Sequence, residues 1–194
     1  MAAETTSATF NAIWFAPSLI LGLGITRLFS DSIRLFRSRS KARMDWLPMM
    51  WAICVFVWQI QYLWAVIELA KFVMNWTLFD FLLLIGLSLS LFVAGALVLP
   101  DIELREGDDL GQSFSRDGRW ALAALSIWGF LALVTDWSLF GSDFVTRETA
   151  LMSTATVTPI LFLLIRNRTL KVGITLVYFV TTFVSAWILS PKAY

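Results

Sequence analysis

The sequence predicts an all-α membrane protein, a single domain in which six transmembrane helices form a polytopic bundle. Three observations support this fold class. Of the 194 residues, 58% are hydrophobic and only 15% are charged, whereas a soluble domain carries roughly 25% charged residues. Six apolar stretches approach or exceed the length that crosses a bilayer. The Lys and Arg residues also gather in alternate connections between those stretches.

A helix needs about 20 mostly apolar residues to cross the hydrocarbon core. The apolar stretches are continuous, which argues against the alternating strands of a membrane barrel. The predicted spans cover residues 10–29, 46–70, 77–99, 120–139, 149–165 and 170–189.

Charged and aromatic residues bound the first three spans. Span 10–29 ends where the cations of the first connection begin. Span 46–70 opens with Trp46, a residue type enriched at the membrane interface. Span 77–99 opens close to Asp80. These ends indicate where each helix leaves the hydrocarbon.

The last three spans have similar boundaries. Span 120–139 opens with Trp120 and ends near Asp136. Span 149–165 contains Pro159, and proline inside a helix removes a backbone donor and can kink it. The sixth span, 170–189, follows a short basic connection. No linker or low-complexity segment indicates a second domain.

The distribution of cations predicts the orientation. Twelve Lys and Arg residues belong to the first, third and fifth connections, and three lie on the opposite side. Cytoplasmic loops carry an excess of such residues. We therefore expect a membrane protein with both termini outside the cytoplasm.

Composition argues against several functions. The chain has no His and a single Cys, Cys54, so His-ligated haem, His-based zinc sites, His-based triads and disulfides are excluded. A net charge of +1 gives no field for nucleic acid. No phosphate-binding or protease motif is present. We expect a non-enzyme that has no cofactor or metal and does not bind nucleic acid.

Four polar residues within or beside the spans are candidates for an ion or proton path: Glu68, Gln61, Asp80 and Asp136. Ionisable residues inside a membrane are costly and are functional candidates by default. Glu68 and Gln61 are seven residues apart and share a helix face. The alternative interpretation is that the carboxylates simply mark helix ends in the headgroup zone.

The first connection carries a second candidate site. Phe29, Ile33 and Phe36 fall on one helical face, which predicts that the first helix continues beyond the membrane as an amphipathic extension. The candidate residues for binding anionic lipid are Arg34, Arg37, Arg39, Lys41 and Arg43. These charges also serve to orient the protein, and both roles remain open. The acidic stretch that begins at Asp101 is expected to face this basic connection, in the same chain or in a neighbour.

Two stripes within the spans have packing as the favoured interpretation. Thr175, Tyr178, Thr182 and Ser185 recur at helical spacing, which favours a close helix contact over a pore lining. Trp51, Trp58 and Trp64 run through the second span. They could flank a pigment, quinone or lipid tail, but packing is commoner.

The chain resembles a group of uncharacterised small bacterial inner-membrane proteins with six helices. The residues that carry the resemblance are the run Leu19–Arg27, the Arg-rich first connection, Asp45–Pro48 and Gln59–Trp64. The resemblance implies topology and a bacterial source, and it implies no activity.

Two functions follow as hypotheses. The chain is either a small channel or transporter for a cation or proton, or a non-catalytic membrane subunit or scaffold that binds lipid or a membrane-protein partner. Membrane lipids are the expected partners, within a homo-oligomer or a larger membrane complex.

Overall fold

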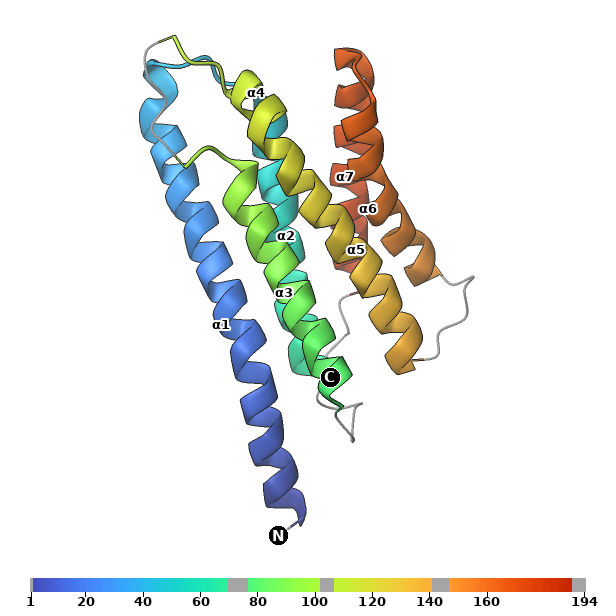
Figure 1. Ribbon diagram of the computed structural model, residues 1–194. Coiled ribbons are helices and arrows are strands. Elements are labelled where there is room, and N and C mark those ends of the chain that lie inside the picture. Colours follow the sequence, from blue (N-terminus) through green and yellow to red (C-terminus); the bar gives the residue numbers. More distant parts are fainter. Residues whose placement is uncertain (1, 70–76, 102–106, 141–146, 190–194) are drawn as a thin grey trace.

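The computed structural model describes residues 2–69, 77–101, 107–140 and 147–189 (Figure 1). All regular elements in these ranges are helical, so the predicted all-α class is confirmed. The long helices are α1 (Ala2–Arg37), α2 (Trp46–Leu69), α3 (Leu78–Val98), α5 (Arg119–Phe140), α6 (Arg147–Leu164) and α7 (Arg168–Leu189). Three short helices join them: η1 (Ser38–Ser40), α4 (Leu110–Ser113) and the π-helical turn η2 (Phe114–Gly118).

The predicted spans agree with the long helices, with two differences. Helix α1 runs to Arg37 as one continuous helix, which is eight residues past the end of the predicted span 10–29. The third connection is shorter than expected, because residues 110–118 are helical and lead directly into α5. Asp109 begins this segment by accepting hydrogen bonds from the amides of Gly111 and Gln112. The ring of Phe114 lies against Gly118, and a Cβ at position 118 would overlap that ring.

The long helices alternate in direction and pack as a closed ring in the order α1, α3, α5, α6, α7, α2. Helix α2 also packs against α3. Connections 38–45 and 165–167 and helix α4 lie together at the upper end in Figure 1. The described cations of the predicted cytoplasmic side gather at this end, which we call the basic end.

Large apolar side chains cover the outside of the ring. Leu78 is 73% exposed, Leu164 is 74% exposed and Trp187 is 87% exposed. A surface of this kind is far more apolar than a soluble monomer tolerates. Four described helices are long and apolar enough to cross a membrane: Trp46–Ile67, Leu78–Val98, Leu110–Ser138 and Arg168–Ile188.

The other two long helices fall outside this set. In α6 the apolar part is Thr149–Leu164, about 24 Å long at 1.5 Å per residue, and a typical hydrocarbon core is about 30 Å thick. The described part of α1 is likewise not among the four. Six transmembrane crossings therefore remain a prediction, although six long helices are present.

A buried amide determines how closely α1, α2 and α3 approach. Gln59 of α2 is fully buried, and its Nε2 donates to the carbonyl of Leu91 in α3 at 3.1 Å. A Cβ added at Gly24 of α1 would lie 2.9 Å from that nitrogen, and one added at Gly95 of α3 would lie 2.8 Å from it. The two glycines therefore leave the space that the amide occupies.

We expect Gly95→Ala to destabilise the protein by about 1–3 kcal/mol, because the new methyl overlaps the Gln59 amide and forces the helices apart. Thermal unfolding in an uncharged detergent measures the effect. The matched control is Gly22→Ala, where a Cβ meets nothing within 4 Å. Equal unfolding temperatures for the two variants would contradict this account of the packing.

Candidate functional site at the basic end of the bundle

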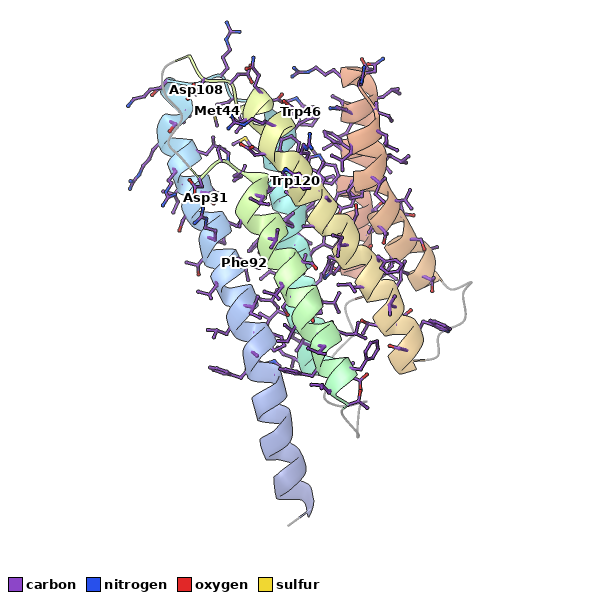
Figure 2. All side chains as sticks on the ribbon, in the orientation of Figure 1. Asp31, Met44, Trp46, Phe92, Asp108 and Trp120 are labelled. Carbon is purple, nitrogen blue, oxygen red and sulfur yellow. The ribbon has the colours of Figure 1, made fainter. Side chains whose placement is uncertain are left out.

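A buried carboxylate lies where α3 ends beside α1. Asp31 of α1 is 0% exposed, and in Figure 2 it lies well below Met44 and Asp108, which are at the basic end. The Arg27 Nε is 3.1 Å from Asp31 Oδ2, and the Arg34 Nη1 is 3.4 Å from Asp31 Oδ1. Both arginines come from the same helix, one turn before and one turn after the carboxylate.

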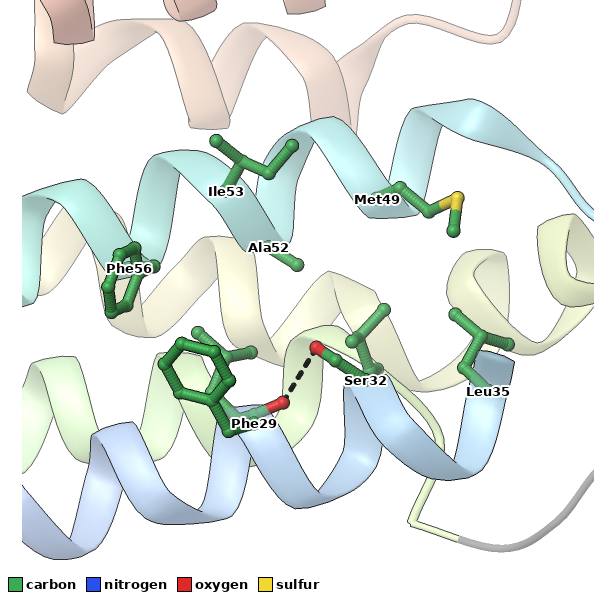
Figure 3. Close-up of a pocket in the computed structure, with 9 residues that line it drawn as sticks. Phe29, Ser32, Leu35, Met49, Ala52, Ile53 and Phe56 are labelled. Atoms are coloured by element: carbon green, nitrogen blue, oxygen red, sulfur yellow. Dashed lines mark hydrogen bonds between the residues drawn. The ribbon is translucent and has the colours of Figure 1, made fainter. Parts of the chain in front are cut away.

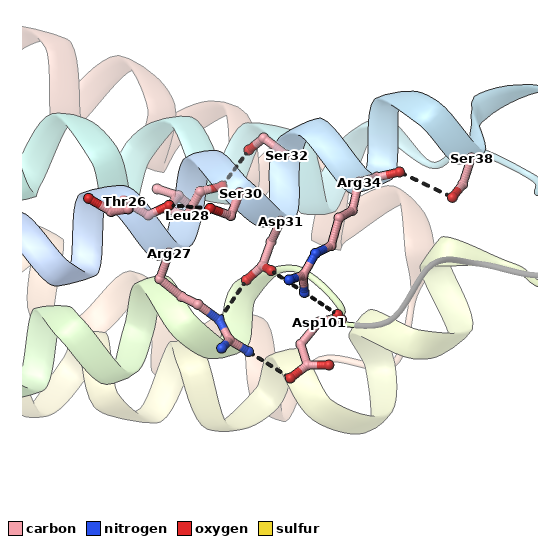
Figure 4. Close-up of polar contacts among 9 residues, drawn as sticks. All are labelled: Thr26, Arg27, Leu28, Ser30, Asp31, Ser32, Arg34, Ser38 and Asp101. Atoms are coloured by element: carbon pink, nitrogen blue, oxygen red, sulfur yellow. Dashed lines mark hydrogen bonds and ion pairs between the residues drawn. The ribbon is translucent and has the colours of Figure 1, made fainter.

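The chain that leaves α3 completes this cluster (Figure 4). Arg27 Nη2 donates to Asp101 Oδ2 at 2.6 Å, and Arg34 Nη1 donates to the backbone carbonyl of Asp101 at 2.6 Å. The two arginines thus bridge the buried carboxylate of α1 to the first residues after α3. We call Arg27, Asp31, Arg34 and Asp101 the Asp31 cluster.

Two opposing effects act on the ionisation of Asp31: burial favours its neutral form, and the neighbouring arginines favour its charged form. Burial raises the pKa of the Asp31 carboxyl above its ordinary value, and the positive charge of Arg27 is the main effect that opposes this rise. Removing water from a charge costs free energy that a partner must offset. Asp31 therefore depends on its arginines to remain ionised in the folded protein.

Backbone hydrogen bonds join the first and third connections. The amide of Arg43 donates to the carbonyl of Asp108 at 2.9 Å, and the amide of Leu110 donates to the carbonyl of Arg43 at 3.1 Å. The amide of Gly107 donates to the carbonyl of Lys41 at 3.3 Å. The expectation that these connections face each other holds within one chain, and backbone groups make the contact.

Asp45, at the end of the first connection, contacts the starts of α2 and α7. Its Oδ1 accepts from the amide of Leu47 at 3.1 Å, at the start of α2. Its Oδ2 lies 3.2 Å from Arg168 Nη2, at the start of α7. One carboxylate therefore links the beginnings of two helices that are far apart in the sequence.

The remaining predicted lipid-binding cations point outward. Arg37, Arg39, Lys41 and Arg43 are exposed, whereas Arg34 belongs to the Asp31 cluster. The Arg39 guanidinium lies 3.9 Å from the centre of the Phe36 ring, and its Nη1 donates to the Phe36 carbonyl at 2.9 Å. Of the five predicted lipid-binding residues, Arg34 therefore pairs with Asp31, and the other four are exposed.

An apolar groove lies beside these cations, between α1 and α2 (Figure 3). Its volume is about 230 Å³. The residues that line it are Leu28, Phe29, Ser32, Leu35, Met49, Ala52, Ile53, Phe56 and Leu99. Helical spacing predicts that Phe29 lies on an apolar helix face. It does not predict a groove, because the facing wall comes from another helix.

The four candidates for an ion path have separate surroundings. Asp80 forms a capping box with Thr77 at the start of α3, with its Oδ2 2.7 Å from the Thr77 hydroxyl. Gln61 is half-buried, and its Nε2 donates to the Thr182 carbonyl of α7 at 3.4 Å. Asp136 is half-buried near the end of α5. The side chain of Glu68 lies outside the part that the structure describes.

The hydroxyl stripe of α7 faces α2 rather than the outside. Thr175, Tyr178, Thr182 and Ser185 are all buried. The Trp51 indole donates to the Thr175 hydroxyl at 3.2 Å, and its ring stacks on Tyr178 with centroids 4.5 Å apart. The stripe therefore forms a close helix contact, as the favoured interpretation predicted.

The tryptophans of α2 behave similarly. Trp58 packs against Trp128 of α5, with ring centroids 4.8 Å apart, and Trp51 also meets Phe162 of α6 at 5.4 Å. Trp64 is exposed. Protein side chains thus surround the two buried indoles, which favours packing as their role.

Comparison with known proteins finds no matching family model, curated relative or solved structure.

We expect Arg27→Gln to lower the free energy of unfolding at pH 7 by about 1–2 kcal/mol, because it leaves the buried Asp31 carboxylate with one weak partner. This lies below the usual cost of breaking a buried ion pair, because Arg27 is itself 39% exposed. Without Arg27 the pKa of Asp31 rises further. A raised carboxyl pKa gives stability that is present at low pH and is lost as the pH rises through the folded-state pKa. The penalty should therefore be smaller at pH 5 than at pH 7.

Chemical unfolding in detergent at both pH values measures this loss. Adding Asp31→Asn to Arg27→Gln should restore part of the stability at pH 7, since a neutral amide needs no counter-charge. The control is Arg116→Gln, which removes an exposed ion pair with Asp117 and should leave the stability nearly unchanged, because water screens such a pair. A pH-independent loss without rescue would disprove the role given to Arg27.

Proposed function

We propose that this chain is a non-catalytic scaffold or subunit of the bacterial inner membrane, which binds anionic lipid through the cations of its basic end. We also propose that it crosses the bilayer six times and that both termini lie outside the cytoplasm. The observation that carries the proposal is the division of the cations at this end. Within the first connection, Arg34 belongs to the Asp31 cluster, whereas Arg37, Arg39, Lys41 and Arg43 are exposed beside the apolar surface.

The polar groups inside the bundle support a structural rather than a conducting role. Asp80 is engaged in a helix cap, and the amides of Gln59 and Gln61 bond to backbone carbonyls of neighbouring helices. Hydroxyls in the helices bond back to carbonyls four residues earlier, as Ser88 does to Leu84 at 2.8 Å. These groups are held by the protein itself, as helix association in a membrane requires.

Lipid binding follows from the charge and rigidity of the first connection. Hydrogen bonds from the Gly107 and Leu110 amides, and the bond from Arg43 to Asp108, hold the backbone of this connection. The side chains of Arg37, Arg39, Lys41 and Arg43 therefore project from a fixed framework. Each cation near a membrane surface contributes about 1 kcal/mol toward anionic lipid.

We expect the combined replacement of Arg37, Arg39, Lys41 and Arg43 by Gln to lower the affinity for phosphatidylglycerol about tenfold or more. Binding to phosphatidylcholine should not change. Titration of each lipid into the purified protein in uncharged detergent, followed by native mass spectrometry, gives both affinities.

The control for this variant is the pair Arg116→Gln and Arg166→Gln. Both residues are exposed cations near the same end but lie outside the first connection, so their loss should have a much smaller effect. A wild-type protein that binds both lipids equally would refute the proposed function.

The contact between α2 and α7 favours a second candidate, a cation or proton path. Its hydroxyl stripe is buried and lies against α2, where Gln61 contacts the Thr182 carbonyl. Among the described residues, the hydroxyls of Tyr178 and Ser185 have no hydrogen-bond partner. Buried groups of this kind are candidates for a polar pathway.

A flux assay in proteoliposomes separates the two functions. The scaffold proposal expects the wild type to move protons and monovalent cations no faster than empty vesicles. The path hypothesis expects flux that Glu68→Gln or Gln61→Leu abolishes. Wild-type flux that these substitutions remove would replace the scaffold proposal with the transport one.

A further inference from the structure

An aromatic pair lies at one end of the groove between α1 and α2. Phe29 and Phe56 meet edge to face across it, with ring centroids 5.3 Å apart. Figure 3 shows this pair at one end, with Leu35 and Met49 at the other. Ser32 and Ala52 are small side chains between these ends, and their size leaves the hollow.

The groove lies at the expected membrane interface. Trp46 begins α2 and is 43% exposed, and tryptophan is enriched at the interface. The α2 wall of the groove runs from Met49 to Phe56, about 10 Å at the helical rise. The α1 wall, from Leu28 to Leu35, crosses the predicted end of span 10–29. The groove therefore straddles the expected interface on the side of the basic end.

The Leu35 end of the groove lies toward the exposed cations that follow α1. Leu35 lines the groove there, and the next residue, Phe36, carries the Arg39 guanidinium above its ring. Helix η1 places Arg39 directly after α1. A planar guanidinium binds phosphate with two parallel hydrogen bonds, so an apolar slot and a phosphate-binding group follow each other along one helix.

The dimensions favour a slender occupant. A helix with its side chains is about 10–12 Å across, whereas the hollow of about 230 Å³ lies between two adjacent helices. Its walls are almost entirely apolar, and the Ser32 hydroxyl already donates to the Leu28 carbonyl at 2.8 Å. A hydrocarbon chain needs no polar partner and fits these walls.

We propose that the groove binds one acyl chain of an anionic phospholipid whose phosphate is held by Arg39. This inference rests on the proposed function, and it adds a defined site and a stoichiometry of one lipid per chain. The part of the chain nearest the headgroup lies in the groove, from Leu35 and Met49 to the Phe29–Phe56 pair.

Photocrosslinking tests the site directly. The probe is phosphatidylglycerol with a diazirine in one acyl chain, present at low fraction in phosphatidylcholine vesicles that contain the full-length protein. Peptide mapping should find the label on Phe29, Met49 or Ile53. Ser32→Leu fills the groove and should lower this labelling at least fivefold.

The matched control is Ser30→Leu. Ser30 lies on the same helix and donates to the Thr26 carbonyl at 2.8 Å, just as Ser32 donates to Leu28, but it does not line the groove. Labelling of the groove in the Ser30→Leu variant should equal that of the wild type. Ala52→Leu fills the groove from α2 and provides a second test if Ser32→Leu does not fold.

The headgroup contact has its own test. Arg39→Gln should lower groove labelling by phosphatidylglycerol about fivefold and leave labelling by the phosphatidylcholine analogue unchanged. The corresponding control is Arg166→Gln, with no effect on either probe. Equal groove labelling by both lipids in the wild type would overturn the role of Arg39.

The outcomes also separate this inference from the proposed function. If label falls evenly on lipid-facing residues of α7, such as Val180 and Val184, or if Ser32→Leu has no effect, the groove is not a lipid site. The proposed function still stands in that case, provided that native mass spectrometry finds a preference for phosphatidylglycerol that the four exposed cations supply. If the wild-type protein shows no preference for phosphatidylglycerol, both the proposed function and the groove site are refuted.

Discussion

Every polar group inside hydrocarbon must find its partner within the protein, and this constraint organises the structure. The Gln59 amide reaches the Leu91 carbonyl through a space that two glycines leave open. The Tyr62 hydroxyl donates to the Leu84 carbonyl at 2.9 Å, and the Thr182 hydroxyl donates to Tyr178 in its own helix. The amides of Gln59 and Gln61 and the Tyr62 hydroxyl thus bond to neighbouring helices, whereas most Ser and Thr hydroxyls bond within their own helix. In the described part of the chain, the hydroxyls of Tyr178 and Ser185 are exceptions. Because most of these groups are engaged, the exposed features of the basic end carry the functional proposal.

The basic end is built by a different means. Here charged residues are close enough to water to stay ionised, yet the Asp31 cluster removes one carboxylate from solvent completely. Arg27 and Arg34 link this carboxylate to Asp101, and backbone hydrogen bonds join Asp108 and Leu110 to Arg43. The junction holds the first connection in place, so its outward cations need not be ordered again when a headgroup binds. Preorganisation of this kind lowers the entropic cost of binding.

Particular residues show where sequence reasoning stopped. The spacing of Arg27, Asp31 and Arg34 allows them to meet on one helix, but the bond from Arg27 to Asp101, 70 positions after Asp31, comes from the fold. The stretch before α5 was expected to belong to the third connection. The Asp109 cap and the packing of Phe114 over Gly118 instead extend the helix. Both differences arise from contacts that local composition does not encode.

By itself the sequence determined the all-helical class, the positions of the six long helices and the gathering of cations at one end. These properties are sums over neighbouring residues, because hydrophobicity and charge act independently of which helix stands alongside. Only the tertiary structure decided that α1 packs between α2 and α3, that Arg34 pairs with the buried Asp31 while Arg39 makes no ion pair among the described residues, and that small side chains on two helices meet to form a groove. Such features depend on the shapes of surfaces distant in the chain, which meet only after the helices have packed.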